Sequence, residues 1–322
     1  MDQKALIEGL NNLKVFTGNA NPDLAHKICD HLKIPLGDAY VGRFPDGEID
    51  LKINEDIRGA DVFVVQSGSP PVNENLMELL IFIDCIRRAS AARITAVIPY
   101  YGYARKDRKD EGRVPITSKL VANIICKAGV DRVLAMDLHA AQIQGFFDIP
   151  MDHLYAFPVL CGHYKSLNLP NAIVVSPDVG GIKIARAYSR KLNIKMAVVD
   201  KRRVGPEETE VGFVIGDVAG KNVIMIDDLI ATGGSIVQAA NVLKEKGAKD
   251  IYVGTTHALL CGRAAEKLNK APIKELAVTD TIPLDGRAKP LGKKLIVLTI
   301  SGILGEAIRR IHTNESVSAL FV

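Results

Sequence analysis

The sequence predicts an α/β protein with two tandem domains, each a mainly parallel sheet flanked by helices. Short β-branched runs alternate with helix-like segments along the chain, and this alternation is typical of parallel sheets. The segments Val133–Leu138 and Val223–Asp228 also resemble each other, because both are apolar strands that end on an aspartate before a loop. With 322 residues, 48% of them apolar, the chain is long enough for two cores of ordinary domain size.

The predicted strands are the short runs rich in valine and isoleucine, because β-branched side chains fit a pleated sheet. They are 14–17, 62–66, 94–98, 133–136, 173–176, 196–199, 223–226, 251–255 and 295–299. The predicted helices have apolar residues at three- and four-residue spacing, and several end in basic residues followed by glycine or alanine. They are 22–32, 76–89, 117–127, 180–192, 235–246 and 303–311.

We place the domain boundary near Asp152–Phe157, where two prolines interrupt the apolar periodicity. The first domain is therefore expected to span 1–153 and the second 154–322. The C-terminal helix is expected to pack back on the first domain.

Charge and composition argue against several classes of protein. Lysine and arginine number 41 and aspartate and glutamate 37, and a net charge of +4 is too small to indicate a nucleic-acid or membrane partner. Met1–Lys14 does not resemble a signal peptide, and the longest apolar stretch is interrupted by Asp84. The five cysteines are odd in number and form no CxxC pair. We therefore expect a soluble cytoplasmic protein with reduced thiols.

The clearest functional signal runs from Val223 to Ser235. A β-branched strand leads into Asp227 and Asp228 and then into Ala-Thr-Gly-Gly-Ser, which opens a predicted helix. Unpaired N–H groups at a helix N-terminus bind phosphate, and glycines let the phosphate approach closely. Hydroxyl groups such as that of Thr232 add donors, whereas paired carboxylates accept from vicinal sugar hydroxyls. The loop therefore predicts a ribose phosphate site; its simpler interpretation is a solvated acidic turn.

This loop resembles the phosphoribosyl-binding loop of the Rossmann-like phosphoribosyltransferase fold. Other segments resemble the ribose-phosphate pyrophosphokinase family, in order along almost the whole chain. They are 43–48, 100–108, 137–140, 142–150, 176–181 and 200–203. The resemblance implies two phosphoribosyltransferase-type domains. It also implies Mg²⁺-dependent transfer of the β,γ-diphosphoryl group of ATP to the 1-hydroxyl of ribose 5-phosphate, which gives AMP and 5-phosphoribosyl 1-diphosphate.

The same resemblance implies a role for each site residue. Lys201 and Arg203 would be catalytic, because cations stabilise the charge that spreads over the β-phosphoryl oxygens. His139 and Asp178 would contact Mg²⁺ bound to the ATP phosphates. The ATP site would be formed by Phe44, Asp46, Gly47, Glu48, Arg105 and Lys106, with Arg105 reaching it from a neighbouring subunit. The ribose 5-phosphate site would be formed by Arg203, Asp227, Asp228, Ala231, Thr232, Gly233, Gly234 and Ser235.

Several of these residues also have a simpler structural interpretation. His139 can be a structural histidine, Asp178 a helix N-cap, and Phe44 a core aromatic residue. The basic run that ends at Arg203 can be a solvated turn. Two alternative functions also stay open: a phosphoribosyltransferase, which would leave the N-terminal half without a task, and a non-catalytic regulatory relative of the enzyme.

The chain departs from the family pattern at three places. Ala231 stands where a carboxylate is usual, Lys106 where glutamine is common, and the loop 109–113 is shorter and more acidic than in phosphate-activated members. Arg58 and the segment 316–321 do match parts of the regulatory site. The resemblance thus implies orthophosphate and ADP as effectors, weakened by the altered loop, and a homohexamer.

Overall fold

The computed structural model describes residues 10, 12–202 and 211–321, and the chain divides into two compact units. Unit 1 comprises Met1–Tyr155, Thr281–Pro283 and Thr299–Val322, whereas unit 2 comprises Ala156–Asp280 and Leu284–Leu298. The C-terminal segment therefore belongs to unit 1, although most of the second half of the chain lies in unit 2.

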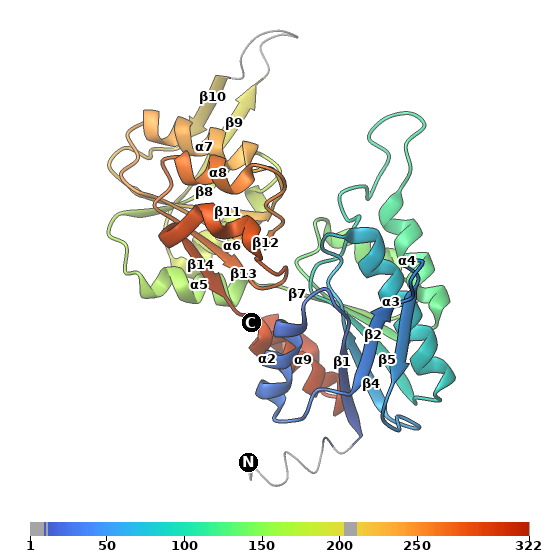
Figure 1. Cartoon of the computed structure of the whole chain (residues 1–322). Helices are drawn as coiled ribbons and strands as arrows, with labels where there is room; N and C mark the ends of the chain where they lie inside the picture. Colours follow the sequence, from blue (N-terminus) through green and yellow to red (C-terminus); the bar gives the residue numbers. More distant parts are fainter. Residues whose placement is uncertain (1–9, 11, 203–210, 322) are drawn as a thin grey trace. The chain divides into compact units, whose positions relative to one another are not determined.

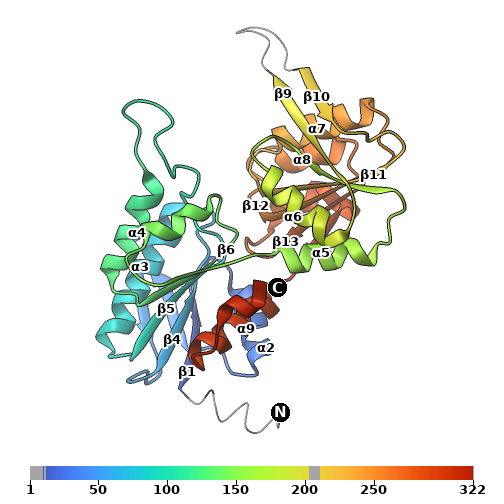
Figure 2. The same ribbon diagram turned by 180° about the vertical axis from the view of Figure 1, so that it is seen from behind.

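Unit 1 is built on a five-stranded sheet in the order β1, β4, β5, β6, β7, with every neighbouring pair parallel. These strands are Leu13–Thr17, Asp61–Val65, Arg93–Ile98, Arg132–Met136 and Met151–Leu154. Helices α3 (Val72–Arg88) and α4 (Thr117–Ala128) lie on one face, and α2 (Pro22–Leu32) and α9 (Ser301–His312) on the other (Figures 1 and 2). The smaller elements are the antiparallel hairpin β2 (Ala39–Arg43) and β3 (Ile49–Ile53), η1 (Ala141–Phe146) and η3 (Val317–Phe321).

Local sequence signals explain where α2 begins and ends. The Asn21 side chain accepts a hydrogen bond from the Leu24 N–H, Pro22 occupies the first turn, and Lys33 closes the helix in the left-handed conformation. Helix α9 packs closely on α2. A Cβ added at Gly305 would come within 2.6 Å of the His31 ring, so a glycine is needed at this contact.

Unit 2 contains a seven-stranded sheet in the order β10, β9, β8, β11, β12, β13, β14. The bounds are β8 Ala172–Ser176, β9 Met196–Arg202, β10 Val211–Ile215, β11 Asn222–Ile230, β12 Ile251–Ala258, β13 Glu275–Thr279 and β14 Leu295–Leu298. Only β10 is antiparallel to its neighbour. The helical elements are α5 (Phe157–Ser166), α6 (Ile182–Leu192), α7 (Gly234–Glu245), α8 (Ala264–Lys270) and η2 (Gly286–Lys294).

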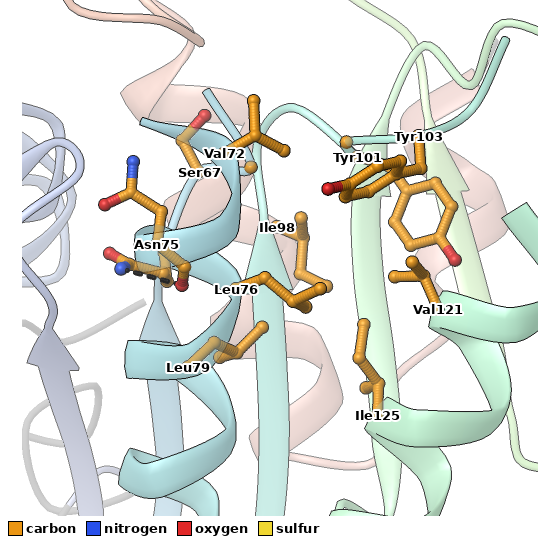
Figure 3. Close-up of a pocket in the computed structure, with 13 residues that line it drawn as sticks. Ser67, Val72, Asn75, Leu76, Leu79, Ile98, Tyr101, Tyr103, Val121 and Ile125 are labelled. Carbon is orange, nitrogen blue, oxygen red and sulfur yellow. Dashed lines mark hydrogen bonds between the residues drawn. The ribbon is translucent and has the colours of Figure 1, made fainter. Parts of the chain in front are cut away.

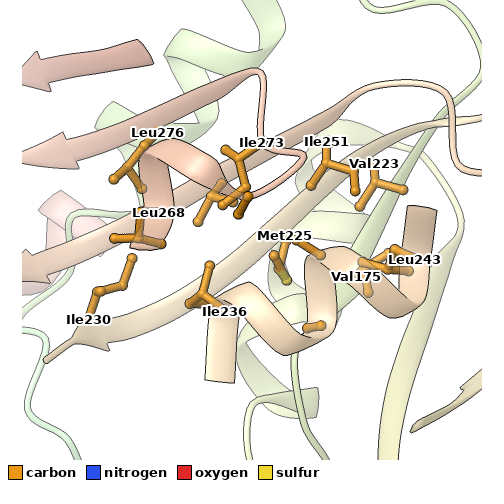
Figure 4. Close-up of a cluster of buried hydrophobic side chains, with 14 of the residues drawn as sticks. Val175, Val223, Met225, Ile230, Ile236, Leu243, Ile251, Leu268, Ile273 and Leu276 are labelled. Atoms are coloured by element: carbon orange, nitrogen blue, oxygen red, sulfur yellow. The ribbon is translucent and has the colours of Figure 1, made fainter. Parts of the chain in front are cut away.

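The core of unit 2 lies between the sheet and α7, α8 and η2. Alternate strand residues such as Val175, Met225 and Ile251 point toward the side of Ile236 and Leu243 of α7, and all of them are buried (Figure 4). Val174 and Ile224, which alternate with these residues, face the opposite side, where α6 packs against β8 and β11. The strands are buried on both faces, which is typical of a parallel sheet.

The sequence analysis identified the fold class and the main elements correctly. Each predicted strand and helix is present, with bounds that shift by a few residues. It missed β2, β3, β7, β10, β13, α5 and α8, which are short or lie at sheet edges. The expectation that the second of the two similar strands ends on its aspartate was wrong, because β11 continues past Asp227 to Ile230 and pairs with β12 as far as Ala258. None of the helices in the described part of the chain is long and apolar enough to cross a membrane.

Candidate active site

The sheet of unit 2 reverses its strand order between β8 and β11. From β8 the chain moves outward to β9 and β10, then returns to β11 on the other side of β8 and continues to β14. Ligands of open α/β sheets bind at such a switch point, outside the carboxyl ends of the strands. Asp178 follows β8, and Asp227 and Asp228 lie near the end of β11, in register with the end of β8. The topology therefore brings these three carboxylates to one edge of the sheet.

The electrostatics of Asp227 reflect this convergence. Burial, repulsion from Asp228, a side-chain hydrogen bond with Asp228 and the charge of Asp178 together raise the pKa of Asp227 to about 8. The Asp228 N–H donates to Asp227 Oδ1 at 3.0 Å, which opposes the shift without cancelling it. Carboxylates held together in this way favour ligands that bring hydroxyl donors or a cation.

The N-terminus of α7 follows directly. Gly233 is the N-cap residue, with φ 73° in the left-handed region, and offers no side chain to the first turn. A Cβ there would also lie 3.2 Å from the Leu268 side chain. The exposed residues Thr232 and Ser235 flank the turn. A twelve-residue helix that begins in this way presents its first N–H groups and its positive dipole end to an anion.

Two neighbouring loops support the site. Asp178 Oδ1 accepts from the Gly181 N–H at 3.0 Å and so orders the turn before α6. The N-cap interpretation of Asp178 was nevertheless wrong, because the N-cap residue of α6 is Gly181. The charge of the same carboxylate also acts on Asp227. The carbonyl of Ala231 accepts from the Cys261 N–H at 2.8 Å. The backbone at Ala231 is therefore held by the loop after β12, whatever its side chain.

In unit 1, the predicted nucleotide residues Phe44, Asp46, Gly47 and Glu48 form the tight turn between β2 and β3. The Phe44 N–H donates to the Glu48 carbonyl at 2.8 Å, and Gly47 has φ 94°. The Phe44 side chain is 49% exposed. It is therefore not a core residue, and its ring is available to stack on a ligand.

A buried polar network that the sequence analysis missed supports this hairpin. Glu78 of α3 is 2% exposed and accepts hydrogen bonds from the Asn19 N–H (2.5 Å), Asn19 Nδ2 (2.9 Å) and Gln66 Nε2 (2.8 Å). Asn19 Nδ2 also donates to the Val41 carbonyl of β2 at 3.2 Å. Arg43 at the end of β2 forms an ion pair with Glu74 of α3 at 2.5 Å. No local pattern predicts these contacts, because they join distant segments.

The loop after β5 carries Arg105, which is exposed, and Lys106. Lys106 Nζ lies 3.2 Å from both carboxylate oxygens of Asp110, and this pairing lowers the pKa of Asp110. Two departures from the family pattern, Lys106 and the acidic loop 109–113, thus form an ion pair with each other through Asp110. Asp107 accepts from Gln142 Nε2 of η1 at 2.8 Å, which joins this loop to the segment that follows His139.

His139 is exposed in the loop after β6. It lies in unit 1, as do the hairpin residues and Arg105, whereas Asp178 and the phosphate loop lie in unit 2. Lys201 belongs to β9, opposite Gly212 of β10, and its side chain is outside the described part of the structure. Arg203 also lies outside the described residues.

Unit 1 also has a small cavity between α3, α4 and the end of β5. Leu76, Leu79, Val121 and Ile125 line it, with Tyr101 at one end (Figure 3). Its volume of about 20 Å³ holds about one water molecule. It is far too small for a nucleotide and belongs to the packing of the helices.

Comparisons with known proteins show the family of the chain. Residues 13–129 match the N-terminal domain of ribose phosphate pyrophosphokinase, and residues 203–322 match the phosphoribosyl synthetase-associated domain. A ribose-phosphate pyrophosphokinase of Rhodopirellula baltica is 55% identical over 315 residues, which cover 97% of this chain and 99% of the relative. The chain belongs to the ribose-phosphate pyrophosphokinase family.

Other members of the ribose-phosphate pyrophosphokinase family match over similar lengths. The Pasteurella multocida enzyme of that name is 54% identical, with coverage of 96% of this chain and 99% of the relative. The crystal structure of phosphoribosylpyrophosphate synthetase from Mycobacterium smegmatis aligns with a TM-score of 0.89 at 40% identity, over 94% of this chain and 100% of that one. The family resemblance of the motifs is therefore confirmed over nearly the whole chain.

Proposed function

We propose that this chain transfers the β,γ-diphosphoryl group of ATP to the 1-hydroxyl of ribose 5-phosphate and releases AMP and 5-phosphoribosyl 1-diphosphate. The observation that carries the proposal is the arrangement at the switch point of unit 2. There an acidic pair, Asp227 and Asp228, is followed after Leu229–Thr232 by the N-cap of α7, Gly233, which has no side chain. Carboxylates suit the vicinal ribose hydroxyls and the helix N-terminus suits the 5-phosphate.

The remaining roles follow the chemistry of the reaction. Phe44 would stack on adenine, and Asp46 and Glu48 would accept from the nucleoside. Arg105 would contact the nucleotide as well. Lys201 and Arg203 would stabilise the negative charge that builds up on the β-phosphoryl oxygens. None of these steps needs a covalent intermediate with the protein.

We propose Mg²⁺ as the cofactor, with His139 and Asp178 among its contacts. In the described residues, no group of three or more His, Cys, Asp or Glu side chains could hold a metal. Mg²⁺ usually keeps several waters and binds through one or two carboxylates plus substrate phosphates. The carboxylates around Asp227, whose mutual repulsion contributes to its raised pKa, fit a metal that arrives with ATP and supplies Lewis-acid polarisation.

The deciding experiment is to incubate the purified protein with ATP, Mg²⁺ and ribose 5-phosphate and to identify the products by phosphorus NMR. AMP together with 5-phosphoribosyl 1-diphosphate is expected. The appearance of ADP, or of no product with fresh protein, would reject the proposal. Product that forms only when a nucleobase is supplied would favour a phosphoribosyltransferase.

We also propose orthophosphate and ADP as effectors, a homohexameric assembly and a cytoplasmic location. Arg58 is exposed, and η3 packs against α9 in the same unit, which supports a regulatory site there. The buried thiols of Cys29 and Cys161, whose pKa values burial raises to about 12, support a reducing compartment. A flat rate across an orthophosphate titration at saturating Mg²⁺ would remove the effector site.

A further inference from the structure

His153 of β7 makes a contact that ordinary sheet packing does not require. Its side chain is 5% exposed, and its Nε2 accepts a hydrogen bond from the backbone N–H of Leu138 at 2.9 Å. Its Nδ1 lies 3.3 Å from Gln144 Nε2 of η1, and its ring centroid is 4.4 Å from that of Tyr155. Leu138 immediately precedes His139. The ring therefore holds the backbone of the loop from which His139 projects.

The loop needs this support because its backbone is strained. Asp137 has φ 36°, a left-handed value that costs free energy in a residue other than glycine. Its N–H donates to the Leu154 carbonyl of β7 at 2.9 Å. The next N–H in the chain, that of Leu138, finds the His153 ring nitrogen as its acceptor. Two successive residues of β7 thus hold two successive residues of the loop.

We propose that His153 is a positioning residue for His139: by accepting from Leu138 it sets the backbone from which His139 reaches the metal-bound nucleotide. This rests on the proposed function, because it assumes that His139 contacts Mg²⁺ bound to ATP. Side chains that orient a ligating residue alter metal affinity or activity by about 10- to 100-fold when they are replaced. His153 acts through one peptide group and does not itself touch the substrate.

The two ring nitrogens allow a matched pair of variants. The amide of glutamine reaches the position of Nε2, so His153→Gln retains an acceptor for Leu138. The amide of asparagine reaches the position of Nδ1, so His153→Asn retains a polar contact with Gln144 but leaves the Leu138 N–H without its acceptor. A role in core packing alone would make both variants similar, because both lose the ring.

The first measurement is hydrogen exchange by mass spectrometry on the full-length protein without ligands, followed in overlapping peptides that cover residues 137–144. We expect exchange in this loop to be at least about 10-fold faster in His153→Asn than in the wild type, and within about threefold of it in His153→Gln. Unchanged exchange in His153→Asn would contradict a role of the His153–Leu138 hydrogen bond in holding the loop, and with it the proposal. Equal acceleration in both variants would show that the ring only fills space.

The second measurement is the Mg²⁺ concentration needed for half-maximal binding of a non-hydrolysable ATP analogue, and for half-maximal turnover. Both should rise by about 10- to 100-fold in His153→Asn and by less than about threefold in His153→Gln. Faster exchange with an unchanged Mg²⁺ requirement would overturn the positioning role. If the wild type forms no AMP, the proposed function fails, while exchange and analogue binding still decide the role of His153.

Discussion

Asp227 illustrates how the fold changes the chemistry of a single residue. In the sequence it is one of two adjacent aspartates of the predicted ribose phosphate loop, and no local pattern indicates an unusual pKa. In the structure, burial and the neighbouring carboxylates of Asp228 and Asp178 raise its pKa to about 8. The raised pKa favours a proton at this site at neutral pH in the ligand-free protein, and binding of a cation to the carboxylate would release it.

The raised pKa predicts how stability depends on pH. Between about pH 4 and 8 the folded state binds a proton at Asp227 that the unfolded chain, with a pKa of about 3.9, has already lost. The melting temperature of the ligand-free protein should therefore fall through this range because of Asp227, and the variant Asp227→Asn should show a flatter profile. Asp217, an exposed residue whose pKa Lys221 lowers, provides the control Asp217→Asn, which should keep the wild-type slope. Parallel profiles for all three proteins would contradict the assignment.

Lys201 tests the catalytic machinery at the same scale. If its ammonium group stabilises the transition state, Lys201→Ala should lower turnover by about 10²- to 10³-fold and leave the melting temperature unchanged. AMP release at saturating ATP, Mg²⁺ and ribose 5-phosphate measures the effect. Lys246→Ala, which removes an exposed lysine after the C-terminus of α7, is the matched control. Near-normal turnover of Lys201→Ala would remove this residue from the catalytic role.

At the scale of elements, the C-terminal helix α9 is held by a polar clamp as well as by its contact with α2. Arg93 at the start of β5 donates through Nε to Asp61 at 2.8 Å and through Nη2 to the Ile311 carbonyl at 2.9 Å. His312 Nδ1 lies 2.8 Å from the same Asp61 carboxylate. Burial acts to raise the pKa of Asp61, but the hydrogen bonds with His312 and Arg93 outweigh it and lower the pKa. These contacts thus tie the C-terminal end of α9 to the first residues of β4 and β5.

Breaking this clamp should destabilise unit 1. Asp61→Asn removes the negative charge that pairs with the partly buried guanidinium of Arg93. We therefore expect the free energy of unfolding to fall by about 3 kcal/mol at pH 7. Because the pKa of Asp61 is lowered in the folded state, its contribution is present above about pH 4 and is lost as the pH falls further. Denaturant unfolding should therefore show the two proteins converging in acid.

The control for this prediction is Asp84→Asn, which removes the surface pair with Arg88. The side chains of that pair are 53% and 78% exposed, so its loss should leave the free energy of unfolding close to that of the wild type. Equal losses in the two variants would mean that the clamp contributes no more than a surface ion pair.

At the scale of the whole molecule, the proposed ATP site would be formed by residues of the β2–β3 hairpin and of the loop that carries Arg105. We propose that these come from different subunits of an oligomer. The exposed ring of Phe44 suits such an arrangement, because a half-exposed aromatic side chain at a hairpin turn is free to contribute to a site completed by another copy.

Mixed oligomers test this arrangement. Phe44→Ala and Arg105→Ala should each be nearly inactive, but random mixing of the two should restore about one quarter of the sites, because a site can draw both intact residues from different chains. Turnover after co-refolding or co-expression measures the restored fraction. Mixing Phe44→Ala with the double variant should restore none. A mixture no more active than its components would place both residues of a site on one chain.

The part of the site that the sequence alone could predict is continuous in the chain. In Asp227–Ser235 and in the loop of Asp178 a predicted strand, a turn and polar side chains follow one another in the chain, so local patterning can propose them as binding segments. The same holds for the fold class, because the alternation of strand and helix follows from periodicities of two and of about 3.6 residues. The turn Phe44–Glu48 was proposed only from its resemblance to the family.

The tertiary structure decided what depends on residues far apart in the sequence. The convergence of Asp178 on Asp227, the pairing of Glu78 with Asn19 and the contact of His153 with Leu138 each join separate segments through the sheet. Strand order sets which strand ends become neighbours, and burial sets how strongly their charges interact. Neither quantity is local in the chain, so the sequence determined which groups take part, and the fold determined which of them meet and with what pKa.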